Sequence, residues 1–348
     1  MKNLFHGKSV RHSGVGRFFT GLLLLSTVTG CRHEAPVQIY GQAQGTYYSV
    51  QYYDHGQRQP RTLRPQIDSL LAAFDLSASL WVDSSRLRLL NAGLTDSLDD
   101  VLLFLLDNSL RITDYTDGAF DPRVGRLVQT WGFSFKQRQT PDSSALDTLL
   151  RAARGTVGHI GHQYYRQHDD TELDFNAIAQ GYASDLVGQL LERYGIGDYL
   201  VDIGGEVVAH GTKDDGQPWR VGIERPAADS LSKPEVMTAI ELRDASVVTS
   251  GSYRKYYEHD GMRFSHTIDP ATGRPVQHTL LSVSVVESES WLADAMATAY
   301  MVMGLDGARA FIASHAGGPG TEAVYFIYDD HGTLKTYATP AFEELIIK

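Results

Sequence analysis

Residues 250–275 read SGSYRKYYEHDGMRFSHTIDPATGRP, and the rest of the chain is organised around this stretch. Apolar, β-branched runs at 246–249 and 280–286 lie on either side of it and are typical of buried strands. Between them, glycines and prolines predict tight turns. We therefore expect a polar loop held between two strands, which is where proteins often place their chemistry.

His266 is the candidate catalytic residue of this loop, because an imidazole exchanges protons near neutral pH. The alternative is a histidine that only makes local hydrogen bonds on the surface of a hairpin. Considered alone, the loop favours that alternative, and only the rest of the chain changes the balance.

The first 31 residues resemble a targeting sequence, with four basic residues and no acidic one. The apolar run Phe18–Val28 is too short to span a bilayer. Small residues then lead into Cys31, as in bacterial lipoprotein signals, which predicts cleavage before this cysteine and lipid on its sulfur. An ordinary secretory signal followed by an incidental cysteine is the alternative.

The predicted boundaries follow from this signal. Residues 1–30 are expected to be a lipoprotein signal peptide, 31–38 the lipidated cysteine and a tether, and 39–348 one catalytic domain. The protein would then face the periplasm from a bacterial membrane, either the inner or the outer one. Cys31 is the only cysteine, so the fold cannot rely on an intramolecular disulfide.

Without the signal the chain is strongly acidic. Removing four basic residues from 31 leaves 27 Lys and Arg against 42 Asp and Glu, a net charge of −15. This charge argues against nucleic acid as a partner and against broad contact with anionic lipid. An anionic substrate would have to be held locally, by a metal ion or by helix N-termini.

Hydrophobic periodicity predicts both strands and helices along the chain. A strand pair is expected at 39–53, and a strand interrupted by two glycines at 199–210. Further strands of the same sheet are expected at 219–224 and 236–243, with a last strand at 323–328. Helices are predicted at 62–73, 99–113, 290–303 and 306–316, and a short strand leading into a helix at 171–194.

Asp294 and Thr298 lie four residues apart in an apolar helix, which places both oxygens on one helix face. A buried carboxylate is costly unless it is paired or bound to a metal. A carboxylate with a hydroxyl suits a hard cation such as Mg²⁺. The alternative is a hydrogen-bonded aspartate near the start of the helix, and the residues alone leave the two interpretations even.

Three further features are ambiguous when taken singly. Trp81 is either a core residue, which composition favours, or a flat surface for an aromatic ligand. The segment 118–133 exposes backbone amides to a ligand or simply connects two helices. Asp174 lies where a helix is expected to begin, and capping backbone amides is an ordinary role for a carboxylate there.

Eight motifs, in order, resemble the FAD:protein FMN transferase family, the ApbE-type flavin transferases, over residues 37–345. Each motif is weak alone, but eight in the family's order are specific. They are GQAQGTYYSV (41–50), SLWVDSSRLRLLN (79–91), GAFDPRVGRLVQTWGF (118–133), LDFNAIAQGYASD (173–185), YLVDIGGEVVAHG (199–211), VVTSGSYRKYYE (247–258), SHTIDPATGRPV (265–276) and LADAMATA (292–299).

The resemblance implies an α+β fold of mixed β-sheets with flanking helices, forming a single large catalytic unit. It implies Mg²⁺-dependent transfer of FMN from FAD to a threonine or serine hydroxyl of a target flavoprotein, through a phosphoester bond and with release of AMP. The target would be a subunit of a membrane redox complex. An FAD pyrophosphatase, which gives free FMN and AMP, is the alternative. A non-catalytic flavin-binding lipoprotein and a solute-binding protein explain the motifs less well.

The resemblance also implies roles for single residues. His266 matches the residue that takes the proton from the acceptor hydroxyl. Asp294, Thr298 and the backbone carbonyl of Ala177 match the Mg²⁺ ligands. Positions that match FAD contacts are Gln44, Trp81, Ala119, Phe120, Asp121, Asp174, Gln180 and Ile268.

Three of these positions depart from the family's pattern. Gln44 stands where methionine is frequent, and Trp81 where many members have tyrosine. Gln180 stands where lysine is common, which removes a positive charge from near the phosphates.

Overall fold

We describe the protein from a computed structural model that covers residues 35–55, 63–133, 141–226, 235–252, 256–259, 262–265 and 267–348, with only the backbone of 256–259 and 262–265. Residues 34–348 cluster into one compact unit. The predicted signal peptide and Cys31 lie outside the described residues, as does His266. Within the described residues, no helix has both the length and the apolar character needed to cross a membrane.

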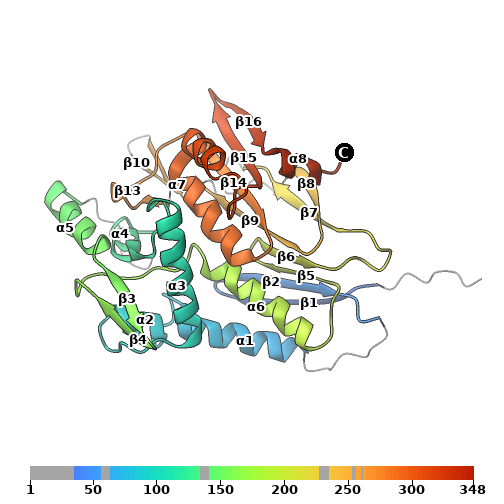
Figure 1. Cartoon of the computed structure of the whole chain (residues 1–348), viewed down its shortest axis with the longest axis horizontal. Helices are drawn as coiled ribbons and strands as arrows, with labels where there is room; N and C mark the ends of the chain where they lie inside the picture. The colour runs from blue at the N-terminus through green and yellow to red at the C-terminus, as the bar shows by residue number, and fades with distance from the viewer. Residues whose placement is uncertain are drawn as a thin grey trace, which may run out of the picture. The chain divides into compact units, whose positions relative to one another are not determined.

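The described part of the chain is built on an eight-stranded sheet, shown in Figure 1. All of its described strand pairs are antiparallel, so the α+β class is confirmed and the sheet itself is not a mixed one. In spatial order the strands are β1 (Val37–Ala43), β2 (Thr46–Tyr52), β5 (Tyr199–Ile203), β6 (Glu206–His210), β9 (Ala245–Gly251), β14 (Leu280–Glu287), β15 (Ala323–Asp330) and β16 (Thr333–Ala338).

The polar stretch at 250–275 lies between two neighbouring strands, as predicted. β9 and β14 pair directly, with Ser250 opposite Val283. The chain between them contains two small hairpins. One joins β10 (Tyr256–His259) to β11 (Met262–Ser265), and the other joins β12 (Ile268–Asp269) to β13 (Arg274–Pro275).

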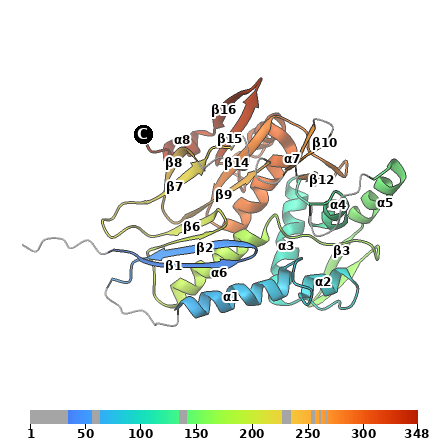
Figure 2. The ribbon, with the colours of Figure 1, turned by 180° about the vertical axis from the view of Figure 1, so that it is seen from behind.

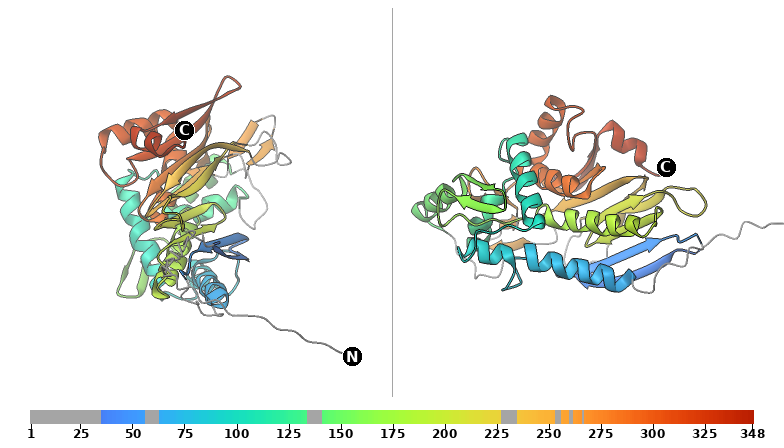
Figure 3. Two further views of the ribbon diagram at one scale, coloured as in Figure 1. Left: turned by 90° about the vertical axis from the view of Figure 1, so that its right-hand side faces the viewer. Right: turned by 60° about the horizontal axis from the view of Figure 1, so that its bottom comes forward.

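Helices cover one face of the sheet, and Figures 2 and 3 show this layer from further sides. Helices α6 and α7 contact the sheet and each other, while α1 and α3 pack on them. The main core lies between these helices and the sheet. It contains buried side chains of both, such as Val201 and Val285 from the sheet and Leu105 and Met296 from the helices. These helices are α1 (Leu63–Ala78), α3 (Asp100–Tyr115), α6 (Ala179–Arg193) and α7 (Ser290–Ser314).

Strands β7 (Trp219–Glu224) and β8 (Val236–Leu242) form a separate two-stranded sheet, which corrects the prediction that they join the main one. Because β6 pairs directly with β9, neither β7 nor β8 lies between these two strands. The β7–β8 hairpin and α8 (Pro340–Leu345) instead bury a second core against the opposite sheet face, around Trp219 and Phe342. Alternating apolar residues fit either arrangement, so the sequence pattern could not separate them.

Between β2 and α6 the chain also forms the shorter elements α2 (Arg86–Asn91), η1 (Pro122–Val124), α4 (Gly125–Thr130), α5 (Ser143–Ala153), β3 (Val157–Ile160) and β4 (Gln163–Arg166). A third apolar cluster joins α4 and α5 to β12 through Leu127, Leu146 and Ile268. The Trp131 indole donates to the Gly273 carbonyl at 2.8 Å. These contacts hold the second half of the 250–275 stretch against α4 and α5.

Two helix predictions need adjustment. No strand forms at 171–175, and the helix begins only at Ala179. The two helices expected at 290–303 and 306–316 are the halves of α7, which is interrupted by the non-helical Gly304 (φ 69°, ψ 174°). The helices predicted at 62–73 and 99–113 are confirmed as α1 and α3, and Asp99 caps α3 by accepting from the Leu102 amide at 2.9 Å.

Candidate functional site

The site is built where the start of α6 crosses α7. The two helices approach so closely that a Cβ added at Gly181 would lie 2.7 Å from the Ser290 carbonyl carbon and 2.9 Å from the Asp294 Cβ. Glycine at 181 therefore lets the backbones meet. The Gly181 amide donates to Asp294 Oδ2 at 3.0 Å, so the carboxylate is held directly at this crossing.

The Asp294 carboxyl is only 5% exposed, and no cation is paired with it among the described residues. Burial raises the pKa of Asp294; the hydrogen bond from Gly181 opposes that rise, and the nearby Asp185 carboxylate adds to it. A carboxylate in such a place is favoured in its charged form only if a cation compensates it. The residue therefore fits the Mg²⁺ ligand that the sequence predicts.

Thr298 lies one turn further along α7 and is half-buried. Its Oγ1 lies 3.2 Å from Ser250 Oγ on β9. Among the described residues, no three or more His, Cys, Asp or Glu side chains are grouped so that they could hold a metal ion by themselves. A set of one carboxylate, one hydroxyl and one carbonyl suits a hard cation that keeps waters or phosphate oxygens as its other ligands.

Ala177 and Gln180 belong to the turn and first residues that begin α6. The Ala179 amide donates to the Phe175 carbonyl at 2.8 Å, which closes the turn around Ala177. The Gln180 side chain packs against Gly204, where an added Cβ would lie 2.5 Å from Gln180 Nε2 and 2.8 Å from Thr46 Cγ2. The start of α6 therefore meets both the β1–β2 turn and the β5–β6 turn.

Gln44 in the β1–β2 turn has a buried side-chain amide whose nitrogen and oxygen have no hydrogen-bond partner within the described residues. Its backbone is in the left-handed region, with φ 53°. Buried amide groups are nearly always satisfied, so an orphaned pair suggests a ligand that would complete them. This supports the prediction that Gln44 contacts FAD.

Asp174 does not cap α6, whose N-cap is Ile178 with no side-chain bond. Asp174 Oδ1 instead accepts from the Asn176 amide at 2.8 Å, within the turn that precedes the helix. Burial raises the pKa of Asp174 to about 6. Its backbone amide donates to the Pro122 carbonyl at 2.7 Å, which joins this turn to the 118–133 segment.

In that segment the three predicted FAD positions differ. Ala119 is half-buried, and the Phe120 side chain is 3% exposed and belongs to the main core. The Asp121 carboxylate is bound to Arg123, with Oδ2 and Nη2 2.7 Å apart. The side chains of Phe120 and Asp121 thus already have partners, and backbone atoms are the better candidates for contact with a ligand.

Trp81 is 60% exposed, so the interpretation of Trp81 as a core residue is wrong. The exposed indole offers a flat apolar surface, and the family resemblance implies that a flavin stacks on it. Ile268 is 6% exposed and packs with α4 and α5, so its side chain is structural. The backbone carbonyl of its neighbour Thr267 accepts a hydrogen bond from the Val276 amide at 3.0 Å, which fixes the backbone at Thr267.

Sequence reasoning missed three residues that organise this site. Ser250 contacts Thr298, and Gly181 permits the helix crossing. Asp185 accepts from the amides of Ser290 and Trp291, both at 2.9 Å, and so caps α7 from α6. All three lie in the quoted motifs, but their roles depend on contacts across 48 to 113 residues of sequence, which no local pattern reports.

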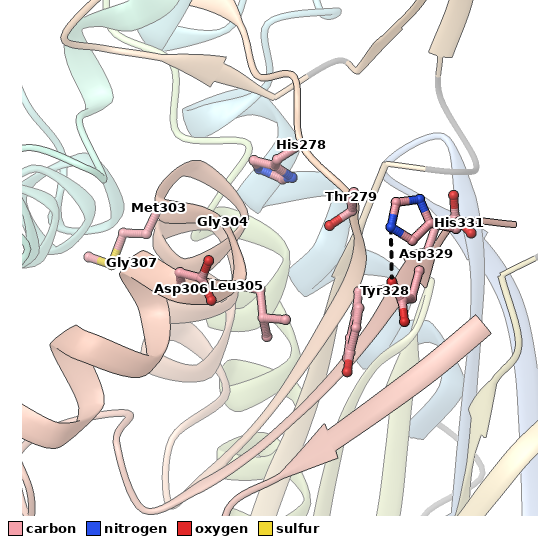
Figure 4. Close-up of a pocket in the computed structure, with 11 residues that line it drawn as sticks. His278, Thr279, Met303, Gly304, Leu305, Asp306, Gly307, Tyr328, Asp329 and His331 are labelled. Carbon is pink, nitrogen blue, oxygen red and sulfur yellow. Dashed lines mark ion pairs between the residues drawn. The ribbon is translucent and has the colours of Figure 1, made fainter. Parts of the chain in front are cut away.

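A pocket of about 450 Å³ lies elsewhere, beyond the Gly304 break in α7, and Figure 4 shows its lining. It contains none of the predicted site residues. Two of its three aspartates have partners: Asp329 accepts from the Gly332 amide at 2.8 Å, and Asp330 pairs with Lys335 and, at 3.8 Å, with His331. His278 Nε2 lies 2.7 Å from the Met301 carbonyl at the break. This contact ties the lining of the pocket to the bend in α7.

Comparison with known proteins shows which family the chain belongs to. The family model described as "ApbE family" matches residues 44–324. The chain therefore belongs to the ApbE family.

Full-length relatives support this assignment. A Vibrio cholerae protein named FAD:protein FMN transferase is 33% identical and aligns with 95% of this chain and 99% of its own length. An Escherichia coli K12 protein of the same name is 34% identical over 88% of each chain. The solved structure of flavin transferase ApbE from Vibrio cholerae matches 89% of this chain and 99% of its own, with a TM-score of 0.77 and 31% identity. The apo form of the Pseudomonas stutzeri flavinyl transferase ApbE gives a TM-score of 0.79 and 31% identity over 90% of this chain and 97% of its own.

Proposed function

We propose that this protein transfers FMN from FAD to a threonine or serine hydroxyl of a target flavoprotein. One observation carries the proposal: proteins named FAD:protein FMN transferase align with nearly the whole of this chain. In the reaction, the acceptor oxygen would form a bond to the phosphorus of the FMN half. The bond from that phosphorus to the bridging pyrophosphate oxygen breaks, and AMP leaves.

Mg²⁺ would be held by Asp294, Thr298 and the carbonyl of Ala177. When bound, this cation neutralises negative charge that develops on the phosphate oxygens. The chain contributes a carboxylate that is buried without a cationic partner among the described residues and is positioned by the Gly181 amide. The N-terminus of α6 adds the positive end of a helix dipole beside this carboxylate, which favours a bound anion.

His266 would take the proton from the acceptor hydroxyl, since a neutral imidazole can do so near pH 7. The FAD site would combine the exposed Trp81 ring, the orphaned amide of Gln44 and the turn around Asp174. Gln180 would offer a neutral amide to the phosphates, which leaves more of the charge to Mg²⁺.

We also propose where the reaction takes place. Cleavage before Cys31 and lipid on its sulfur would anchor the catalytic domain at a bacterial membrane, facing the periplasm. The acceptor would then be a flavoprotein subunit of a membrane redox complex. Replacing Cys31 with serine should release the protein from the membrane fraction, and unchanged fractionation would argue for an ordinary secretory signal.

A mass spectrum tests the reaction. The soluble domain (residues 32–348) is mixed with FAD, Mg²⁺ and a protein that carries a threonine acceptor. We expect a Mg²⁺-dependent mass gain of one FMN on the acceptor, and none when its threonine is replaced by alanine. AMP and free FMN beside an unmodified acceptor would instead indicate a pyrophosphatase. Intact FAD would indicate a binding protein.

A further inference from the structure

Thr298 uses its hydroxyl differently from the other helical threonines in the described chain. A threonine within a helix commonly bonds back to the carbonyl four residues earlier. Thr113, Thr130 and Thr148 all do so, at 2.8, 2.8 and 3.0 Å. The partner of Thr298 is instead Ser250 Oγ, on a strand 48 residues away in sequence.

This difference matters for a hydroxyl that binds a cation. A hydroxyl has one proton and two lone pairs, so a lone pair directed at a cation leaves the proton to be donated elsewhere. Coordination also makes the proton more acidic, which strengthens the hydrogen bond that it makes. Ser250 Oγ, at 3.2 Å, is the acceptor that the structure provides.

We propose that Ser250 is a positioning residue for the cation site. Its Oγ accepts a hydrogen bond from the Thr298 hydroxyl, and this bond directs a lone pair of Thr298 Oγ1 at Mg²⁺. The inference rests on the proposed function, because it assumes that Thr298 is a ligand. Ser250 touches neither FAD nor the cation in this role and acts only through Thr298.

The backbone around Ser250 is well suited to hold it in place. Ser250 pairs with Val283 in the middle of the sheet, and the Ser252 amide donates to the Leu281 carbonyl at 2.8 Å. Both strands pack against α7. The hydroxyl of Ser250 is thus held on a rigid strand, at the point where the chain leaves the sheet toward His266.

The test measures cation binding as well as activity. Mn²⁺ binding to the FAD-loaded protein is followed by electron paramagnetic resonance, and the Mg²⁺ dependence of FMN transfer is measured at saturating FAD. In Ser250→Ala, Thr298 can bond back to its own helix, and we expect both cations to bind about 10- to 100-fold more weakly. Transfer at saturating Mg²⁺ should stay within a few-fold of wild type. Ser250→Thr should restore cation affinity, because it keeps the acceptor oxygen.

Ser252→Ala is the matched control, because Ser252 lies two residues away and its hydroxyl bonds to the carbonyls of Leu280 and Leu281 instead of Thr298. It should bind Mn²⁺ like wild type. Wild-type affinity in Ser250→Ala, or an equal loss in Ser252→Ala, would overturn the proposal. Thr298→Val separates the two claims: if it also binds Mn²⁺ normally, the ligand assignment within the proposed function is wrong, whereas a loss confined to Thr298→Val removes only the role of Ser250.

Discussion

Gly181→Ala tests the helix crossing, because helix propensity predicts a more stable protein and packing predicts a less stable one. Alanine is favoured over glycine inside a helix by about 1 kcal/mol, so propensity alone predicts a more stable protein. The new methyl group, however, would lie 2.9 Å from the Asp294 Cβ and 2.7 Å from the carbonyl carbon of Ser290. Neither contact can be relieved by rotating a flexible side chain.

The expected loss can be worked out from this geometry. Overpacking of this kind costs about 1–3 kcal/mol. Moving α6 away also weakens the bond from the Gly181 amide to Asp294, and hydrogen bonds to charged groups contribute about 1.5–3 kcal/mol. One displacement causes both losses, so they do not add fully. After the propensity gain is subtracted, we expect the free energy of unfolding to fall by about 2–3 kcal/mol.

The assay is thermal unfolding of the soluble domain, followed by circular dichroism with and without Mg²⁺. A change of about 1 kcal/mol shifts the melting temperature of a domain this large by about 2 °C, so a fall of about 4–6 °C is expected. Gly197→Ala is the matched control, because an added Cβ there has no neighbour within 4 Å. It should leave the melting temperature nearly unchanged. If Gly181→Ala proved as stable as wild type or more so, the close crossing of α6 and α7 would be refuted.

Three further predictions concern single side chains. His266→Ala should bind FAD within about twofold of wild type by fluorescence titration but lose about 100-fold or more of FMN transfer, and unchanged transfer would remove His266 as the base. Asp294→Asn should abolish both activity and its Mg²⁺ dependence. In the wild type, Mg²⁺ affinity measured by calorimetry should weaken from pH 8 to pH 6, because burial raises the pKa of the Asp294 carboxyl and a proton then competes with the cation. An affinity that does not depend on pH, or activity in excess chelator, would contradict the metal assignment. Asp174→Asn keeps an acceptor for the Asn176 amide but removes a buried charge. Since the pKa of Asp174 rises from 3.8 to about 6 on folding, its ionisation destabilises the wild type increasingly between pH 4 and 6. The variant's advantage in chemical denaturation without FAD should be absent at pH 4 and reach at most about 3 kcal/mol above pH 6, and a constant difference at all pH values would refute the burial argument.

Local pattern was enough to predict most of the elements. Hydrophobic periodicity over 62–73 predicted α1. The glycine pair at 204–205 was expected to interrupt one strand, and it instead forms the turn between the antiparallel strands β5 and β6. The pattern failed where a segment fits two arrangements equally well. The β7–β8 hairpin could be a part of the main sheet by its apolar residues alone, and only the observed strand order shows that it forms a sheet of its own.

The sequence predicted that Asp294 and Thr298 share one helix, but it did not predict which residues hold them in place. The spacing of Asp294 and Thr298 placed both on one helix face without any structure. What holds them comes from distant parts of the chain: the Gly181 amide from α6 and the Ser250 hydroxyl from β9. Residue spacing predicts which side chains share a face of one helix or strand. Contacts between different helices and strands depend on how the whole domain packs.

The pairing of β9 with β14 has a consequence for how this protein could change. Residues 252–279 leave the sheet and re-enter it at adjoining positions, where Gly251 lies opposite Ser282. A segment joined to a scaffold at two neighbouring points can gain or lose residues without shifting the strand register on either side, since closing a longer loop costs little additional entropy. Changes in the length of the chain between residues 252 and 267 would therefore leave the register of β9 and β14 unchanged, and with it the contact of Ser250 with Thr298.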